Sequence, residues 1–61
     1  MPIVTVKLLA GRSEEQKRQL VDRVTTAVSE TANAPKERIH VIIEEMQPEN
    51  YGVAGVRKSD E

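Results

Sequence analysis

Hydrophobic and polar positions alternate over the first nine residues of the chain. One side of this run holds Val4, Val6 and Leu8, and the other holds Ile3, Thr5, Lys7 and Leu9. β-Branched residues and leucine dominate it, which predicts a β-strand over about 2–9. Because both sides carry apolar residues, we expect a helix to cover one face of the strand and a second subunit to cover the other.

The pattern changes to a helical period over about 14–32. The apolar positions are Leu20, Val24, Ala27, Val28 and Thr31, and the charged residues assigned to the rest of the surface are Lys17, Arg18, Asp22, Arg23 and Glu30. Ser13 and Gln16 match a capping box, so we expect the helix to begin at Glu14 and an ion pair to join Glu14 to Arg18. The segment Asn33-Ala34-Pro35 ends it.

A second alternating run predicts another strand over about 38–46. Ile39, Val41 and Ile43 share one side, and His40, Ile42 and Glu44 share the other. The order strand, helix, strand predicts a parallel pair with a right-handed crossover. A turn and a short apolar piece with two glycines then predict a β-hairpin over about 50–56, followed by a frayed polar tail. The expected fold is α/β (α+β), a single βαβ unit with a C-terminal hairpin, in one domain over 1–61.

Chain length makes self-association the expected source of stability. A chain of 61 residues buries only about 60% of the surface that its unfolded form exposes. The sequence contains no cysteine, so neither disulfides nor a cysteine-ligated zinc can reinforce it. A lone βαβ unit also leaves both sheet edges open for pairing with another chain. We therefore expect an oligomer.

Charge and composition argue against nucleic acid and membrane partners. The chain has nine Lys and Arg against ten Asp and Glu without a block of one sign, and Tyr51 is its only aromatic residue. Basic patches and base-stacking platforms are therefore missing. No apolar run approaches the roughly 20 residues that span a bilayer, and no signal-peptide pattern is present. These features predict a cytoplasmic protein.

Few residues suggest chemistry by their type alone. If Met1 is removed, Pro2 becomes a terminal secondary amine, which can act as a base, whereas an internal proline nitrogen cannot. Taken singly, Arg12 is most simply a solvated loop residue, His40 a packed or edge strand residue, and Tyr51 an interface anchor. We expect no metal site, since no second histidine accompanies His40 and Glu44 and Glu45 point to opposite faces.

Taken in order, these residues match a known pattern. Its parts are Pro2-Ile3-Val4, Leu9, Gly11-Arg12-Ser13-x-x-Gln16-Lys17, Ala34-Pro35, Val41-Ile42-Ile43-x-Glu45-Met46 and Tyr51-Gly52-Val53-x-Gly55. In this order and at this chain length, they resemble the 4-oxalocrotonate tautomerase family. The most specific parts are the Pro2 start, the Gly11-Arg12-Ser13 turn and the block from Ile42 to Met46.

The resemblance implies a cofactor-independent isomerase, a keto–enol tautomerase assembled as a homohexamer of three dimers. Pro2 would be the general base acting on a small unsaturated 2-hydroxy acid such as 2-hydroxymuconate. Arg12 of a neighbouring subunit would bind a carboxylate of this anionic substrate. The main-chain N–H of Leu9 would hold the reacting end, and Tyr51 would stand where the family has an aromatic wall.

One departure from the family pattern concerns substrate binding. His40 stands where the family's characterised members carry a second arginine, and it cannot offer the permanent charge or bidentate fork of a guanidinium. Two alternatives stay open. The chain could be a relative that hydrates or dehalogenates unsaturated acids with Pro2 as an acid, or an assembly module without catalysis.

Overall fold

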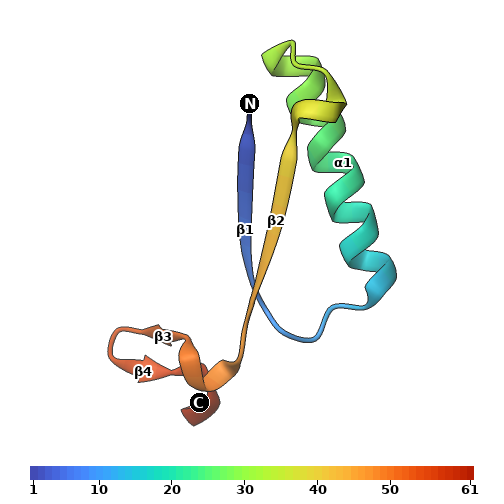
Figure 1. Cartoon of the computed structure of the whole chain (residues 1–61). Coiled ribbons are helices and arrows are strands. Elements are labelled where there is room, and N and C mark those ends of the chain that lie inside the picture. The colour runs from blue at the N-terminus through green and yellow to red at the C-terminus, as the bar shows by residue number, and fades with distance from the viewer.

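The fold is a strand, a helix and a second strand, followed by a small hairpin (Figure 1). The computed structural model describes the whole chain, residues 1–61. In chain order the elements are β1 (Ile3–Leu9), α1 (Glu14–Ala32), β2 (His40–Met46), β3 (Gly52–Val53) and β4 (Val56–Arg57). Short 3-10 turns cover Lys36–Arg38, Pro48–Asn50 and Lys58–Asp60. The predicted βαβ unit with a C-terminal hairpin is confirmed.

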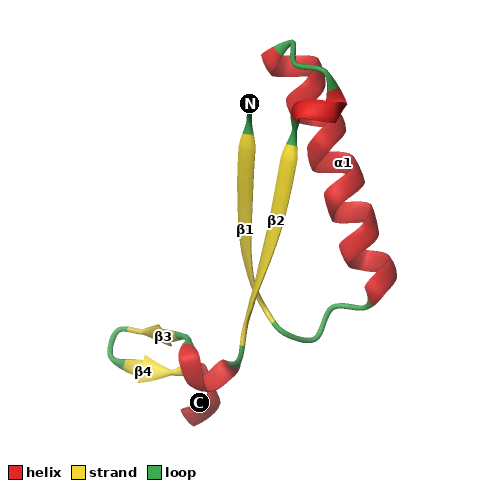
Figure 2. Ribbon diagram, in the orientation of Figure 1, coloured by secondary structure: helices red, strands yellow, loops and turns green.

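The two long strands pair in parallel, as expected, and α1 runs back alongside them (Figure 2). Their register places Ile3 beside His40 and Thr5 beside Ile42. Successive side chains of a strand point to opposite faces, and exposure alternates accordingly along β1 and β2. The face that carries Val4, Val6, Val41 and Ile43 is half-buried, and the face that carries Ile3 and Ile42 is open.

The helix begins through the predicted capping box. The Gln16 main-chain N–H donates to Ser13 Oγ over 3.1 Å, and the Ser13 N–H donates to Gln16 Oε1 over 2.9 Å. These two bonds satisfy donors that a helix start would otherwise leave unpaired. At the other end, Asn33 adopts a left-handed conformation, with φ of 55°, which stops the helix. None of the chain's helices combines the length and hydropathy needed to cross a membrane.

Two expectations about charges on α1 are wrong. Arg18 pairs with Glu15 at 3.4 Å rather than with Glu14. Lys17 does not lie on the solvated side, because it precedes Val24 by seven residues and so falls on the helix face that packs on the sheet. There its ammonium group forms ion pairs with Glu14, at 3.3 Å, and with Glu45 of β2, at 3.0 Å.

The second strand is shorter than the predicted range of 38–46. The N–H of Arg38 donates to the Pro35 carbonyl over 3.0 Å, and the N–H of Ile39 donates to the Lys36 carbonyl over 3.1 Å. These bonds close a 3-10 turn, so the strand begins only at His40. Arg38 therefore lies outside the sheet.

The hairpin is also displaced from its predicted range of 50–56. Asn50 ends the 3-10 turn Pro48–Asn50, and the paired residues are Gly52 with Arg57 and Val53 with Val56. Both residues of the connecting turn have positive φ, 54° at Ala54 and 84° at Gly55, as two-residue hairpins of the type I′ class require. The tail is a 3-10 turn with an Arg57–Asp60 ion pair at 3.1 Å rather than a frayed end.

The chain has almost no core of its own. Ile39 is the one residue that is buried, at 9% exposure, whereas Ile3 is 57% exposed and Ile42 is 47% exposed. The radius of gyration is 14.5 Å, against about 10 Å for a compact domain of this length. Figure 1 shows the reason, since the hairpin extends away from the βαβ unit. Such a chain leaves its apolar sheet face uncovered.

Candidate active site

Pro2 and His40 lie together at the end of the sheet where β1 starts. The His40 main-chain N–H donates to the Pro2 carbonyl over 3.0 Å, which continues the ladder one residue before β1. Pro2 is half-buried, and its nitrogen is bonded to the exposed Met1. The register also puts His40 beside Ile3 on the open face of the sheet. An amine at Pro2 would therefore stand at the rim of the sheet, next to His40.

Leu9 and Arg12 lie together at the other end of β1. The Nη1 atom of Arg12 donates to the Leu9 carbonyl over 3.3 Å, and the guanidinium is otherwise exposed. Gly11 precedes Arg12 with a φ of 129°, a value that residues with a side chain rarely adopt. Arg12 thus keeps most of its donors free for a bidentate partner such as a carboxylate.

Tyr51 lies past the end of β2, between the turn Pro48–Asn50 and β3. It is half-buried, and its carbonyl accepts a hydrogen bond of 2.8 Å from the Lys58 main-chain N–H. This bond joins the residue to the 3-10 turn that ends the chain. Tyr51 is therefore held beside the hairpin, which lies far from the N-terminus (Figure 1).

A single chain does not bring the five predicted site residues together. Pro2 and His40 occupy one end of the parallel pair, whereas Leu9, Arg12 and Tyr51 belong to the other. The seven residues of β1 separate these ends by roughly 20 Å, at about 3.3 Å per residue. No side chain spans that distance. Within one chain, Pro2 has His40 beside it, whereas Arg12 lies beyond the far end of β1.

A further charged cluster joins the start of α1 to the end of β2. The ammonium group of Lys17 is 3.0 Å from Glu45 Oε1 and 3.3 Å from Glu14 Oε1. These hydrogen bonds, that to Glu45 first, raise the pKa of Lys17 above its usual value. The sequence signal for this cluster is a lysine in register with the apolar stripe of an amphipathic helix, a position that requires a partner.

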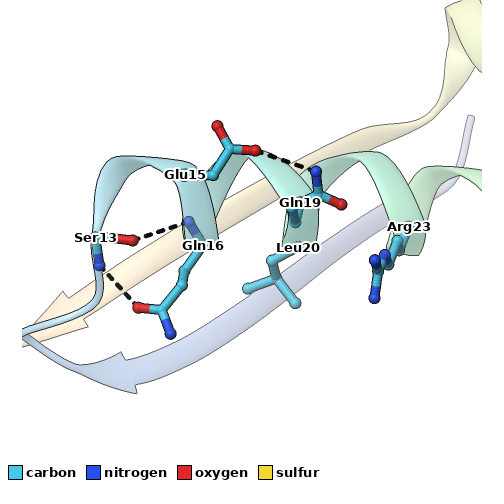
Figure 3. A pocket seen from close by; sticks show the side chains of 6 residues that line it. All are labelled: Ser13, Glu15, Gln16, Gln19, Leu20 and Arg23. Carbon is cyan, nitrogen blue, oxygen red and sulfur yellow. Dashed lines mark hydrogen bonds between the residues drawn. The ribbon is translucent and has the colours of Figure 1, made fainter.

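A depression of about 410 Å³ lies on the first turns of α1. Its lining residues are Ser13, Glu15, Gln16, Gln19, Leu20 and Arg23. Figure 3 shows Gln16, Leu20 and Arg23 pointing to one side of the helix, with Glu15 and Gln19 bonded to each other above. All six residues come from one helix and its cap, so the depression has a single wall. None of the five predicted site residues lines it.

No three His, Cys, Asp or Glu side chains converge in the chain, so no residues are put forward as metal ligands. The groups available for chemistry are the potential amine at Pro2, the imidazole of His40, the guanidinium of Arg12 and the phenol of Tyr51. An amine can move a proton, and a guanidinium can bind an anion.

Known proteins resemble this chain over its whole length. Residues 2–61 match the family described as Tautomerase enzyme. "Probable tautomerase BH3814" of Halalkalibacterium halodurans is 66% identical over 61 residues, which is 100% of both chains. The structure of YwhB, a homologue of 4-oxalocrotonate tautomerase, superposes with a TM-score of 0.95 at 58% identity and covers 98% of each chain.

The structural likeness extends to distant relatives. A heterohexamer 4-oxalocrotonate tautomerase from Chloroflexus aurantiacus J-10-fl has a TM-score of 0.92 at 28% identity, covering 98% of this chain and 97% of its own. Fold and sequence thus agree with the pattern from Pro2 to Gly55. The chain belongs to the tautomerase family of isomerases, among the homologues of 4-oxalocrotonate tautomerase.

Proposed function

We propose that the chain, after removal of Met1, is a cofactor-independent keto–enol tautomerase in which the amine of Pro2 is the general base. Its substrate class is the small unsaturated 2-hydroxy acids, of which 2-hydroxymuconate is the reference compound. The observation that supports this is the position of Pro2 at the rim of β1, beside His40, in a chain of the tautomerase family.

The proposed reaction moves one proton and leaves the enzyme unchanged. The amine of Pro2 takes the proton of the substrate's enol hydroxyl, and the oxygen becomes a carbonyl as the double bonds shift. The ammonium then returns the proton to a carbon farther along the conjugated system. A base that works at neutral pH should titrate near 7. A guanidinium beside the amine disfavours the ammonium form and so lowers its pKa.

We propose that a neighbouring subunit supplies what one chain lacks. Arg12 and the main-chain N–H of Leu9 lie about one strand length from Pro2 of their own chain, so they can reach only a Pro2 of another chain. Arg12 would bind a substrate carboxylate, and the main-chain N–H of Leu9 would hydrogen-bond to the reacting end of the substrate. The Tyr51 ring would form one side of the site. Arginine and main-chain donors also stabilise the developing negative oxygen, so the reaction needs no metal or organic cofactor.

The assembly that we propose is a homohexamer built as three dimers. The open sheet face with Ile3 and Ile42 and the extended hairpin provide two separate surfaces for association. One surface would form a dimer, and the other would join dimers into a closed ring. A relative described as a heterohexamer, with a TM-score of 0.92, supports an assembly of six subunits.

The carboxylate-binding role is tested by Arg12→Ala in protein whose Met1 has been removed. A charge-assisted hydrogen bond contributes about 1.5–3 kcal/mol, so we expect kcat/KM for 2-hydroxymuconate to fall by roughly 10- to 150-fold. The measurement is steady-state kinetics at fixed pH and ionic strength. Arg18→Ala is the matched control, because Arg18 is exposed and contacts only Glu15. Equal kinetics for the two variants would contradict the proposal.

Replacing His40 with arginine tests its proposed place in the substrate site. A guanidinium can bind a second carboxylate bidentately, so His40→Arg should raise kcat/KM for 2-hydroxymuconate by about tenfold. Phenylenolpyruvate has a single carboxylate and should gain much less. The ratio of the two kcat/KM values, measured with the oligomer mass verified, reports the effect. An unchanged ratio would remove His40 from the site.

A further inference from the structure

The turn that carries Arg12 is fixed to β2 at both of its ends. On the strand side, the Ala10 main-chain N–H donates to the Met46 carbonyl over 2.9 Å. On the helix side, Lys17 Nζ is 3.0 Å from Glu45 Oε1. Glu45 and Met46 are consecutive residues, so the two bonds attach the turn to one point at the end of β2. Arg12 lies between them.

The ion pair between Lys17 and Glu45 differs from the other ion pairs of the chain. The side chains of Lys17 and Glu45 are 23% and 36% exposed, whereas that of Arg18 is 70% exposed. Shielding from water strengthens an ion pair. Lys7 and Glu44 also join two elements, but they are 3.8 Å apart and both well exposed. The bond of Lys17 is the one side-chain hydrogen bond that links α1 to the sheet.

Lys17 is also connected directly to the residue after Arg12. Its main-chain N–H donates to the Ser13 carbonyl over 3.1 Å, the first hydrogen bond of the helix. The turn has little support of its own, because glycine at position 11 restricts the backbone less than any other residue and Arg12 makes only a 3.3 Å hydrogen bond, to the Leu9 carbonyl. A guanidinium on an unsupported turn would have to be ordered at each binding event.

We propose that Lys17 and Glu45 are positioning residues, which hold the Arg12 turn so that its guanidinium is ready for the substrate carboxylate of a neighbouring site. The inference rests on the proposed function of Arg12 and extends it to two residues that do not touch substrate. Glu14 adds a second acceptor for the same ammonium group at 3.3 Å. Lys17 and Glu45 therefore act through Arg12.

The test compares Lys17→Met with Arg12→Ala and with the double variant, in protein without Met1. Methionine keeps an unbranched apolar stem and removes the charge. We expect KM for 2-hydroxymuconate to rise roughly 5- to 20-fold, in the range that coupled neighbours show, with kcat changed less than threefold. Lys17→Arg should restore most of the loss. Arg18→Met, the exposed counterpart, should leave both constants unchanged.

The double variant separates positioning from general stability. If Lys17 acts through Arg12, Lys17→Met should change KM by less than twofold when residue 12 is already alanine. The same loss in both backgrounds, or no loss in the single variant, overturns the inference. If Arg12→Ala raises KM and Lys17→Met does not, only the positioning inference is overturned. If Arg12→Ala also leaves KM unchanged, the carboxylate-binding role of Arg12 is overturned as well. If Lys17→Met does not assemble, Glu45→Met, which removes the acceptor for Lys17 and keeps an unbranched stem, is judged by the same criteria.

Discussion

Protein that keeps an uncleavable residue before Pro2 should lose roughly 10²- to 10⁴-fold in kcat/KM for 2-hydroxymuconate, the contribution expected of a positioned general base. With Met1 attached, the Pro2 nitrogen is an amide and has no basic lone pair. The assembly should not change, because the hydrogen bond from the His40 N–H to the Pro2 carbonyl does not involve the Pro2 nitrogen and forms with Met1 attached. Intact mass identifies the two forms, and kinetics compares them.

Pro2→Ala complements that comparison. It leaves a primary amine in place of the ring-held secondary amine, so it should remove most but not all of the turnover while the oligomer persists. An unchanged rate in either the blocked protein or Pro2→Ala would eliminate Pro2 as the base.

The direction of the pH–rate profile distinguishes the roles that Pro2 can play. A base must be unprotonated, so kcat/KM rises as the pH increases through the pKa of the amine and then levels off. The hydratase or dehalogenase alternative uses the ammonium form, so its rate falls over the same range. A folded oligomer with neither activity would instead support a role in assembly only.

Ile42→Asp should abolish the folded oligomer. Ile42 lies in the middle of the open sheet face, beside Thr5, and is 47% exposed in the single chain. If a second subunit covers this face, the substitution buries a carboxylate without a partner, at a cost of several kcal/mol. The free energy of unfolding of a folded domain is only about 5–15 kcal/mol. This chain has little reserve, because Ile39 is its one buried residue.

Sedimentation and circular dichroism measure the outcome of Ile42→Asp, with Ile42→Val as the control at the same position. The aspartate variant should sediment as a monomer with reduced helix signal. The valine variant should keep the mass of the parent. An Ile42→Asp protein of full oligomer mass and normal melting temperature would show that this face is not an interface.

Local patterns in the sequence are sufficient to predict the helix and strands and their order along the chain. The alternation around Val4 and Val6 predicts β1, and Ser13 with Gln16 predicts the start of α1, because both signals act between near neighbours. The start of β2 was missed because the turn after Pro35 uses the N–H of Arg38 in a local bond. An alternating pattern cannot show that competition.

The arrangement of the candidate site depends on pairing that is not local. The register of β1 with β2 puts Pro2 next to His40, and nothing near either residue encodes it. Charge alone predicts the wrong side of the helix for Lys17, although its spacing from Val24 indicates the side that faces the sheet. Its partner Glu45 could be identified only once the strands were paired.

The length of β1 has a consequence for how damage spreads in the proposed assembly. In that assembly, each chain would give its amine to one catalytic centre and its guanidinium to a different one. A chain with a substituted Arg12 would therefore lower the activity of the centre that contains a neighbour's Pro2, while the centre with its own Pro2 keeps its activity. A chain with a substituted Pro2 would have the reverse effect. Two kinds of chain could accordingly divide the labour, one contributing the base and the other the anion-binding group, so that catalysis belongs to the contact between subunits.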